Sequence, residues 1–176
     1  MYKRQAKFSK DKNILKIPQP IIMKNGSKIM SLIDGSKKMS KSDPNEGSRI
    51  NLLDAPEIIT KKIKKAKSDS YVGMEFNNPE RAESRNLLMI YSILSGKEIS
   101  QCEKEFSETG WGTFKKFITE QLVESLEPIQ KKYKLLINDP YQLNKILDEG
   151  KEKAEDLANQ TLKRVKSKLG FFEMEK

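Results

Sequence analysis

Apolar residues recur at helical spacing through the last two-thirds of the chain, and this periodicity constrains the fold more than any other feature. Intervals of 4, 4, 3 and 4 separate Ile118, Leu122, Leu126, Ile129 and Tyr133. A later stretch repeats these intervals with Ala154, Ala158, Leu162, Val165 and Leu169. Intervals of three and four place side chains on one face of an α-helix. The pattern predicts a helical bundle from residue 54 onward, with faces centred on Ile63, Leu122 and Leu162 buried.

Start and stop signals place the individual helices. Asp54 and Glu57 have the spacing of a capping box, which predicts a helix that begins at residue 54. Helices are also predicted over 86–94, which Gly96 ends, over about 99–106, and from about 112 onward. Pro128 predicts a kink in the last of these, and residues 139–140 predict the start of a further helix.

The first 53 residues have a different character. They contain prolines among isoleucines and an Asn-Gly turn signal at residues 25–26, and residues 28–33 predict a short strand. A loop follows, with three lysines between residues 34 and 44. The composition therefore changes from loops and short strands to helices near residue 54.

Charge and rare residues narrow the possible functions. Lysine and arginine total 34 against 25 acidic residues, a net charge of +9, which favours polyanionic partners such as nucleic acid or nucleotide phosphates. The chain has no histidine, which excludes a Ser-His-Asp triad and every zinc site that needs imidazole. The single Cys102 excludes an internal disulfide and gives no sign of secretion. No apolar run is long enough to span a membrane, and no metal site is predicted.

The loop after the predicted strand is the most specific motif. It reads Lys38-Met39-Ser40-Lys41-Ser42 and alternates cations with hydroxyls. Two ammonium groups three residues apart can close on a triphosphate and stabilise the charge that develops on departing pyrophosphate. Lysine-serine loops are also common as solvated surface turns, and composition alone does not decide between the two interpretations.

These five residues spell the KMSKS signature of class I aminoacyl-tRNA synthetases. The wider run 37–45, preceded by residues 29–32, resembles bacterial-type tryptophanyl-tRNA synthetases, and the blocks 86–96, 110–115 and 147–154 resemble that family in the same order. Trp111 stands where the family usually has tyrosine, and Lys151 where it favours alanine. A tyrosine-specific relative fits the residues around the loop less well.

The resemblance implies a fold and a division of the chain. It implies a mainly α protein in which residues 1–53 are the C-terminal remnant of a Rossmann-like α/β catalytic domain with short strands and the KMSKS loop. Residues 54–176 are then a helical anticodon-binding region, whose last helix packs back on the catalytic domain. The histidine-containing nucleotide motif of the family's first half is missing, so the chain is expected to be the C-terminal half of the enzyme and inactive alone.

The resemblance also implies an activity and partners. The family activates tryptophan with ATP to tryptophanyl-adenylate and transfers it to tRNA(Trp), with Mg²⁺ accompanying ATP. A homodimer is expected for the full-length enzyme, as are a cytoplasmic location and no membrane partner. The alternative from a different class is a non-catalytic basic helical RNA-binding module.

The resemblance also implies roles for the residues of this chain that match the family's motif. Lys38 and Lys41 are expected to bind the ATP phosphates as the catalytic residues, with Lys41 stabilising the transition state. Ser40 and Ser42 are expected to assist, and Ile29 and Met39 to frame the adenine, although an isoleucine on a strand is usually a core residue. These expectations name six ATP-binding residues: Ile29, Lys38, Met39, Ser40, Lys41 and Ser42.

Two further features leave alternatives open. The lysine-rich face over residues 61–67 either contacts tRNA phosphates or is ordinary solvated surface. Trp111 either stacks on an anticodon base or packs as a loop aromatic. Tyr91 and Tyr133 lie on apolar helix faces and are predicted to be core residues, and Cys102 is predicted to be a thiol without a function.

Overall fold

The computed structural model describes residue 15, residues 18–23 and residues 26–171. Residues 22–134 form one compact unit, and the residues from 135 onward belong to a second unit. Among the described residues, no helix is both long enough and apolar enough to cross a membrane.

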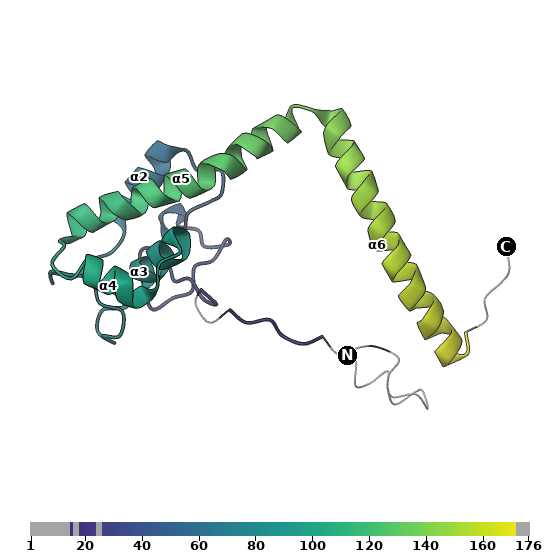
Figure 1. Cartoon of the computed structure of the whole chain (residues 1–176), viewed down its shortest axis with the longest axis horizontal. Helices are drawn as coiled ribbons and strands as arrows, with labels where there is room; N and C mark the ends of the chain where they lie inside the picture. The colour runs from purple at the N-terminus through teal and green to yellow at the C-terminus, as the bar shows by residue number, and fades with distance from the viewer. Residues whose placement is uncertain (1–14, 16–17, 24–25, 172–176) are drawn as a thin grey trace. The chain divides into compact units, whose positions relative to one another are not determined.

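The first unit is built from helices (Figure 1). The chain runs through η1 (Glu46–Ser48), α2 (Pro56–Lys65), α3 (Ala82–Ser95), α4 (Ile99–Glu105) and α5 (Trp111–Ile137), and α3 packs against α4. The helices predicted over 86–94 and 99–106 and from about 112 are confirmed, although α3 begins four residues earlier than predicted. Gly96 ends α3 in the left-handed conformation at φ 70°, as the sequence indicated. Pro128 lies inside α5, and the kink stays a prediction.

The start of α2 differs from the prediction. Its N-cap residue is Ala55, which has no side chain able to cap, and the Asp54 and Glu57 capping box is not formed. The Asp54 carboxylate instead accepts hydrogen bonds from the backbone N–H of Asn51 and from Lys62 Nζ. A nearby ammonium is a stronger partner for a carboxylate than a neutral amide. A side-chain capping box is found at α4, where Glu98 and Gln101 satisfy each other's backbone N–H groups.

The core of the first unit lies between α2, α3, α4 and α5. The buried residues of α5 include Ile118, Leu122 and Leu126, which are the first three members of the predicted stripe. Tyr91 and Phe114 flank Phe106, with ring centroids 4.9 and 4.8 Å from it in edge-to-face geometry. Such aromatic pairs contribute about 0.5–1.5 kcal/mol beyond burial. Tyr91 is buried, as predicted, and Cys102 is buried in the same core.

The strand predicted over 28–33 is not formed, and the described residues contain no strand. Only an isolated antiparallel bridge joins Met30 to Lys38. The segment forms hydrogen bonds to loops and to a side chain instead of to a sheet: the N–H of Leu32 donates to the Ser48 carbonyl, and the Leu32 carbonyl accepts from the Lys67 N–H. Because Leu32 is buried in the same core as Ile59 and Ile63, residues on both sides of position 54 share one core. The Rossmann-like remnant and the boundary at residue 54 stay predictions.

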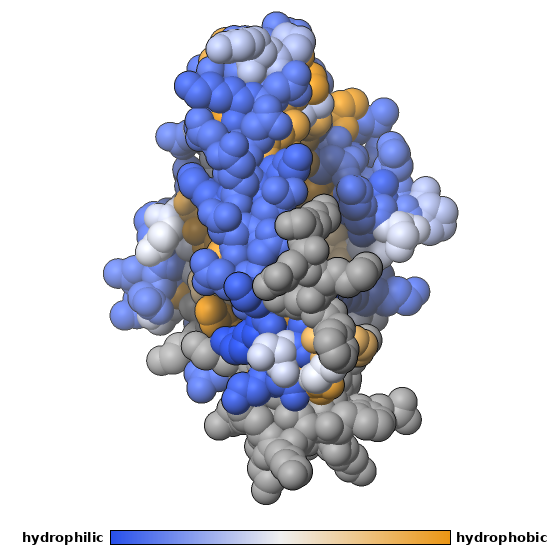
Figure 2. All heavy atoms as spheres, turned by 90° about the vertical axis from the view of Figure 1, so that its right-hand side faces the viewer, coloured by the Kyte–Doolittle hydropathy of each residue, from blue (hydrophilic) through white to orange (hydrophobic). Residues whose placement is uncertain are grey.

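The second unit contains α6 (Pro140–Leu169). Asp139 caps it by accepting a hydrogen bond of 3.0 Å from the Gln142 N–H, which confirms the predicted start. The predicted burial of its apolar stripe is wrong, because α6 contains no buried residue and Leu162 is 49% exposed. Hydrophilic residues dominate the face that α6 presents in Figure 2. The predicted core role of Tyr133 is also wrong, because Tyr133 and Ile129 are about half exposed.

Candidate functional site

The lysine loop, Lys38–Ser42, is fixed at its base. The Met39 N–H donates to the Ile29 carbonyl at 2.9 Å, and the Ser31 N–H donates to the Lys37 carbonyl at 2.8 Å. The side-chain amide of Asn86 on α3 bonds both backbone groups of Met30, accepting from its N–H and donating to its carbonyl, each at 2.8 Å. This bidentate contact ties the base of the loop to a helix 56 residues away in the sequence. Asn86 was not predicted as a site residue.

Turns on both sides hold the ends of the lysine loop. Before it, Asp34 accepts hydrogen bonds from the Ser36 hydroxyl and N–H, and these bonds together with the nearby Lys37 lower the pKa of the Asp34 carboxyl to about 2. Within it, the Ser40 and Ser42 hydroxyls share a hydrogen bond of 3.0 Å. After it, the Asp43 carboxylate accepts from the Asn45 N–H at 2.8 Å. The loop therefore has defined ends, although its lysine and serine side chains face solvent.

The two lysines that were predicted to bind phosphate are exposed. In the described part of the chain, neither the Lys38 nor the Lys41 ammonium has a hydrogen bond or an ion pair. Their neighbour Lys37 lies 3.2 Å from the Asp34 carboxylate. The loop thus presents two ammonium groups and two hydroxyls that are available to an anion.

Ile29 and Met39 line the same apolar pocket, of about 230 Å³. The rest of its lining is aliphatic and comes from the segments around residues 32 and 50 and from α2, α3 and α5: Leu32, Ile50, Leu52, Ile63, Ile90, Ile93, Leu94, Leu122 and Leu126. Sequence reasoning predicted the first two residues from the resemblance and missed the other nine. Six of the nine lie on α2, α3 and α5, whereas Leu32, Ile50 and Leu52 lie outside the helices, so only the tertiary structure brings them to one pocket.

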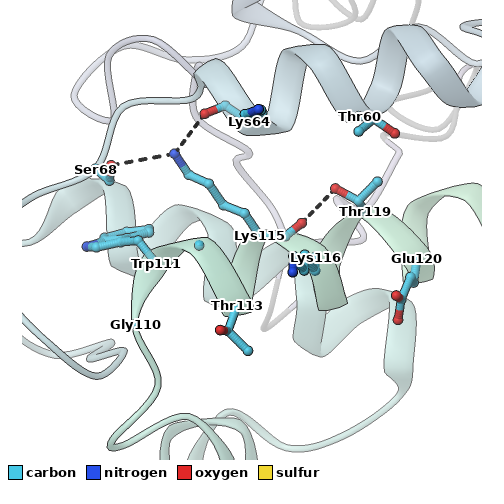
Figure 3. Close-up of a pocket in the computed structure, with 11 residues that line it drawn as sticks. Thr60, Lys64, Ser68, Gly110, Trp111, Thr113, Lys115, Lys116, Thr119 and Glu120 are labelled. Atoms are coloured by element: carbon cyan, nitrogen blue, oxygen red, sulfur yellow. Dashed lines mark hydrogen bonds between the residues drawn. The ribbon is translucent and has the colours of Figure 1, made fainter.

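A second and more polar hollow lies between α2 and α5, with a volume of about 890 Å³ (Figure 3). We call it the basic groove. It is lined by Thr60, Lys64, Ser68, Gly110, Trp111, Gly112, Thr113, Lys115, Lys116, Thr119 and Glu120. Of the predicted lysine face over 61–67, Lys64 lies in this lining, whereas Lys62 is buried and bonded to Asp54.

Lys115 joins the two helices that form the groove. Its ammonium donates to the Lys64 and Ala66 carbonyls at the C-terminal end of α2, at 3.3 and 2.6 Å, and to the Ser68 hydroxyl at 3.5 Å. Cations are favourable at this end of a helix because the last carbonyls there lack partners. Burial lowers the pKa of Lys115. Sequence reasoning gave Lys115 no role, because nothing in its local pattern indicates a partner on another helix.

Trp111 is the first residue of α5 and is partly buried. Its indole Nε1–H donates to the Asp69 carboxylate at 3.0 Å, and the same carboxylate accepts two bonds from Arg81, at 2.8 and 3.1 Å. Burial opposes ionisation of Asp69, but the bonds from Arg81 and Trp111 outweigh it and hold the pKa of Asp69 below its ordinary value. The packed interpretation of Trp111 is therefore correct, and its ring also lines the basic groove.

Comparison with known proteins identifies the class. The model of a family described as tRNA synthetases class I (W and Y) matches residues 3–127, and the chain therefore belongs to this family. It is 78% identical over 171 residues to a tryptophan–tRNA ligase of Prochlorococcus marinus subsp. pastoris (strain CCMP1986 / NIES-2087 / MED4), covering 97% of this chain and 51% of that relative. The predicted family resemblance is confirmed.

Solved structures agree with this result. The crystal structure of tryptophanyl-tRNA synthetase from Mycoplasma pneumoniae matches 97% of this chain and 51% of its own, with a TM-score of 0.84 and 30% identity. A second structure, from Campylobacter jejuni and complexed with ADP and tryptophan, has a TM-score of 0.60 at 22% identity and supports the fold alone. The chain spans about half the length of the curated relatives it matches.

Proposed function

We propose that this chain carries the ATP-phosphate loop and the helical region of a tryptophan–tRNA ligase. The observation that carries the proposal is the lysine loop, whose base is bonded to Asn86 while the ammonium groups of Lys38 and Lys41 remain free for an anion. Family membership and the 78% identity to a tryptophan–tRNA ligase support the same function.

The proposed reaction begins with adenylate formation. A carboxylate oxygen of tryptophan attacks the α-phosphorus of ATP, the bond from that phosphorus to the bridging oxygen breaks, and pyrophosphate leaves with the electron pair. Negative charge increases on the pyrophosphate oxygens, and cations placed there stabilise the transition state more than the ground state. We assign this role to Lys41, with Lys38 as its partner. A ribose hydroxyl of tRNA(Trp) then attacks the acyl carbon, the bond from that carbon to the phosphate oxygen breaks, and AMP leaves.

The remaining loop residues complete the ATP site. We propose that Ser40 and Ser42 donate hydrogen bonds to phosphate oxygens, which requires that their mutual bond of 3.0 Å opens. Ile29 and Met39, which line one apolar pocket, are proposed to contact the adenine. The polar side chains of the loop are two ammonium groups and two hydroxyls, with no carboxylate to hold a metal ion. Mg²⁺ is therefore proposed to arrive bound to ATP as part of the substrate.

The other family properties stay proposals for this chain. They are the division at residue 54, a homodimer of the full-length enzyme and a cytoplasmic location. The non-catalytic RNA-binding module is the alternative, and the basic groove is compatible with it. The two functions predict different roles for the lysine loop, because an RNA-binding module without catalysis would not need Lys41 for pyrophosphate chemistry.

A chimera tests the proposal. The matching 171 residues of the Prochlorococcus ligase are replaced by this chain, and tryptophan-dependent pyrophosphate exchange is measured. We expect an active chimera in which Lys41→Ala slows adenylate formation on the order of a hundredfold, equivalent to about 3 kcal/mol. Lys37→Ala is the matched control in the same segment and should change the rate less than threefold. An inactive chimera, or a Lys41→Ala rate within about threefold of the parent, would contradict the proposal.

A further inference from the structure

Asn86 is a buried polar residue in the interior of α3. Its side chain is only 4% exposed, and asparagine is a weaker helix former than alanine because its amide competes for backbone groups. In the described part of the chain, every hydrogen bond of this amide goes to another segment. Its oxygen accepts from the Met30 N–H and its nitrogen donates to the Met30 carbonyl, each at 2.8 Å, with a longer bond of 3.5 Å to the Ser31 carbonyl. The amide therefore serves the segment that precedes the lysine loop and not its own helix.

Met30 lies directly opposite Lys38. The two residues form the isolated antiparallel bridge, and the hydrogen bonds beside it run between their neighbours in the sequence. In this pattern the N–H and carbonyl of Met30 point away from Lys38, toward the place where a further strand would lie. The described residues contain no strand there, and the Asn86 amide bonds both groups instead. Asn86 thus takes the place of the next strand and holds the bridge from its outer side.

The same helix also supports the entry to the lysine loop. Gly35 is buried against the first turn of α3, where a Cβ on it would lie 2.9 Å from the Ala82 carbonyl carbon and 3.0 Å from the Glu83 nitrogen. Glycine permits this close approach of two backbones because it has no side chain. α3 therefore contacts this segment at two points, at Gly35 and at Met30. The backbone of Lys38 is fixed between them, whereas its side chain is exposed.

We propose that Asn86 is a positioning residue for adenylate formation, which acts through Met30 on the backbone of Lys38. The inference rests on the proposed function, in which Lys38 binds the phosphates of ATP. Without the amide, the two backbone groups of Met30 lose their partners, and the bridge must shift to find others. A displacement of about 1 Å at a catalytic group can lower a rate about a hundredfold. Asn86 contributes to the rate in this way without touching the substrate.

Single-turnover adenylate formation by the chimera described above tests this role. Asn86→Ala should lower the maximal rate by about tenfold or more. The dissociation constant for tryptophan and the fraction of active enzyme should both stay within about twofold of the parent, because only the phosphate loop is displaced. Ser92→Ala is the matched control, since Ser92 is 5% exposed on the same helix and donates to the Lys97 carbonyl at 2.6 Å. This control should leave the rate within about threefold of the parent.

A double-mutant cycle separates positioning from a general loss of structure. In the Lys38→Ala background, Asn86→Ala should slow the reaction by less than about threefold, because the side chain that it positions is already absent. A purely structural role would lower the rate by the same factor in both backgrounds and would overturn the proposal. Rates within about threefold of the parent for Lys38→Ala or Asn86→Ala alone, or a loss in Ser92→Ala equal to that in Asn86→Ala, would overturn it as well.

A second variant and a measurement on the unsubstituted chain apply even where Asn86→Ala does not fold. Asn86→Asp keeps the volume of the side chain and an acceptor for the Met30 N–H but loses the donor to the Met30 carbonyl. We expect it to slow adenylate formation by about three- to tenfold, and a rate equal to that of the parent would overturn the proposal. In the unsubstituted chain, the Met30 amide should exchange with solvent about a hundredfold more slowly than the exposed Ser40 amide, and equal exchange rates would also overturn it.

The outcomes distinguish this inference from the proposed function. An inactive chimera, or one that is insensitive to Lys41→Ala, contradicts the proposed function. An active chimera that loses rate with Lys41→Ala and Lys38→Ala but not with Asn86→Ala contradicts the positioning role alone.

Discussion

Lys62 and Asp54 form a nearly buried ion pair, with 2.6 Å between Nζ and Oδ2 and side chains only 10% and 12% exposed. The pair joins the turn before α2 to the helix itself. It also explains why α2 begins without a side-chain cap, since the carboxylate that could cap the helix is bonded to Lys62 and Asn51. Breaking a buried pair leaves one charge without a partner, which is strongly destabilising.

The ion pair should make the free energy of unfolding depend on pH in the acid range. Burial opposes ionisation of Asp54, but hydrogen bonds from Lys62 and Asn51 outweigh it and lower the pKa of Asp54. A lowered folded-state pKa adds stability above the unfolded-state value of about 4, and this stability is lost as pH falls through the folded-state pKa. Asp54→Asn should lower the free energy of unfolding by roughly 3 kcal/mol at pH 7. It should also weaken the dependence of that free energy on pH below about pH 4. Urea unfolding at a series of pH values measures this, and Glu57→Gln is the control, expected to cost less than about 1 kcal/mol.

Gly73 should be far less replaceable than Gly96, although both have positive φ, at 79° and 70°. A Cβ at Gly73 would lie 2.1 Å from the Ser107 carbonyl oxygen, whereas a Cβ at Gly96 would meet nothing within 4 Å. Gly96→Ala should therefore lower the free energy of unfolding only by the strain of alanine in the left-handed conformation, about 1–2 kcal/mol. Gly73→Ala should exceed this loss by about 2 kcal/mol, because backbone must also move. Equal free energies of unfolding for the two variants would show that the Ser107 contact is not rigid.

Two identical substitutions test which helical faces form the core. Leu122 on α5 is 7% exposed, and Leu162 on α6 is 49% exposed. Leu122→Ala should cost roughly 2–5 kcal/mol, because it removes buried methyl groups from a packed core. Leu162→Ala should change the free energy of unfolding by less than about 0.5 kcal/mol. Thermal or urea unfolding measures both changes, and a loss of similar size for the two variants would mean that the face of α6 is buried in solution.

The single cysteine should report opening of the core. Cys102 is fully buried on α4, and burial raises the pKa of its thiol. Both properties slow reaction with thiol reagents, because the thiolate is the reactive form. Labelling of the native chain at pH 7.5 should be at least a hundredfold slower than in 6 M guanidinium chloride (about the ratio expected if labelling needs opening of the core). Native labelling within tenfold of the unfolded rate would show that Cys102 is accessible.

The sequence predicted the candidate site in part. The order Lys38-Met39-Ser40-Lys41-Ser42 indicated the family, and the comparisons confirm that family. It did not indicate that Asn86 would hold the base of the loop, or that Lys115 and Lys64 would meet across two helices. These partners lie 51 to 56 residues apart, and no local pattern encodes such a pairing.

The sequence by itself determined where the helices lie, because helical spacing, Gly96 and Asp139 act through hydrogen bonds within a few residues. Only the tertiary structure decided which faces are buried: the stripe of α5 enters the core as far as Leu126, whereas the similar stripe of α6 does not. It also decided that Asp54 binds Lys62, and that residues 28–33 form one bridge instead of a strand. The physical reason is that periodicity fixes a helix but not its neighbour, and a polar group bonds whichever partner the packing brings nearest.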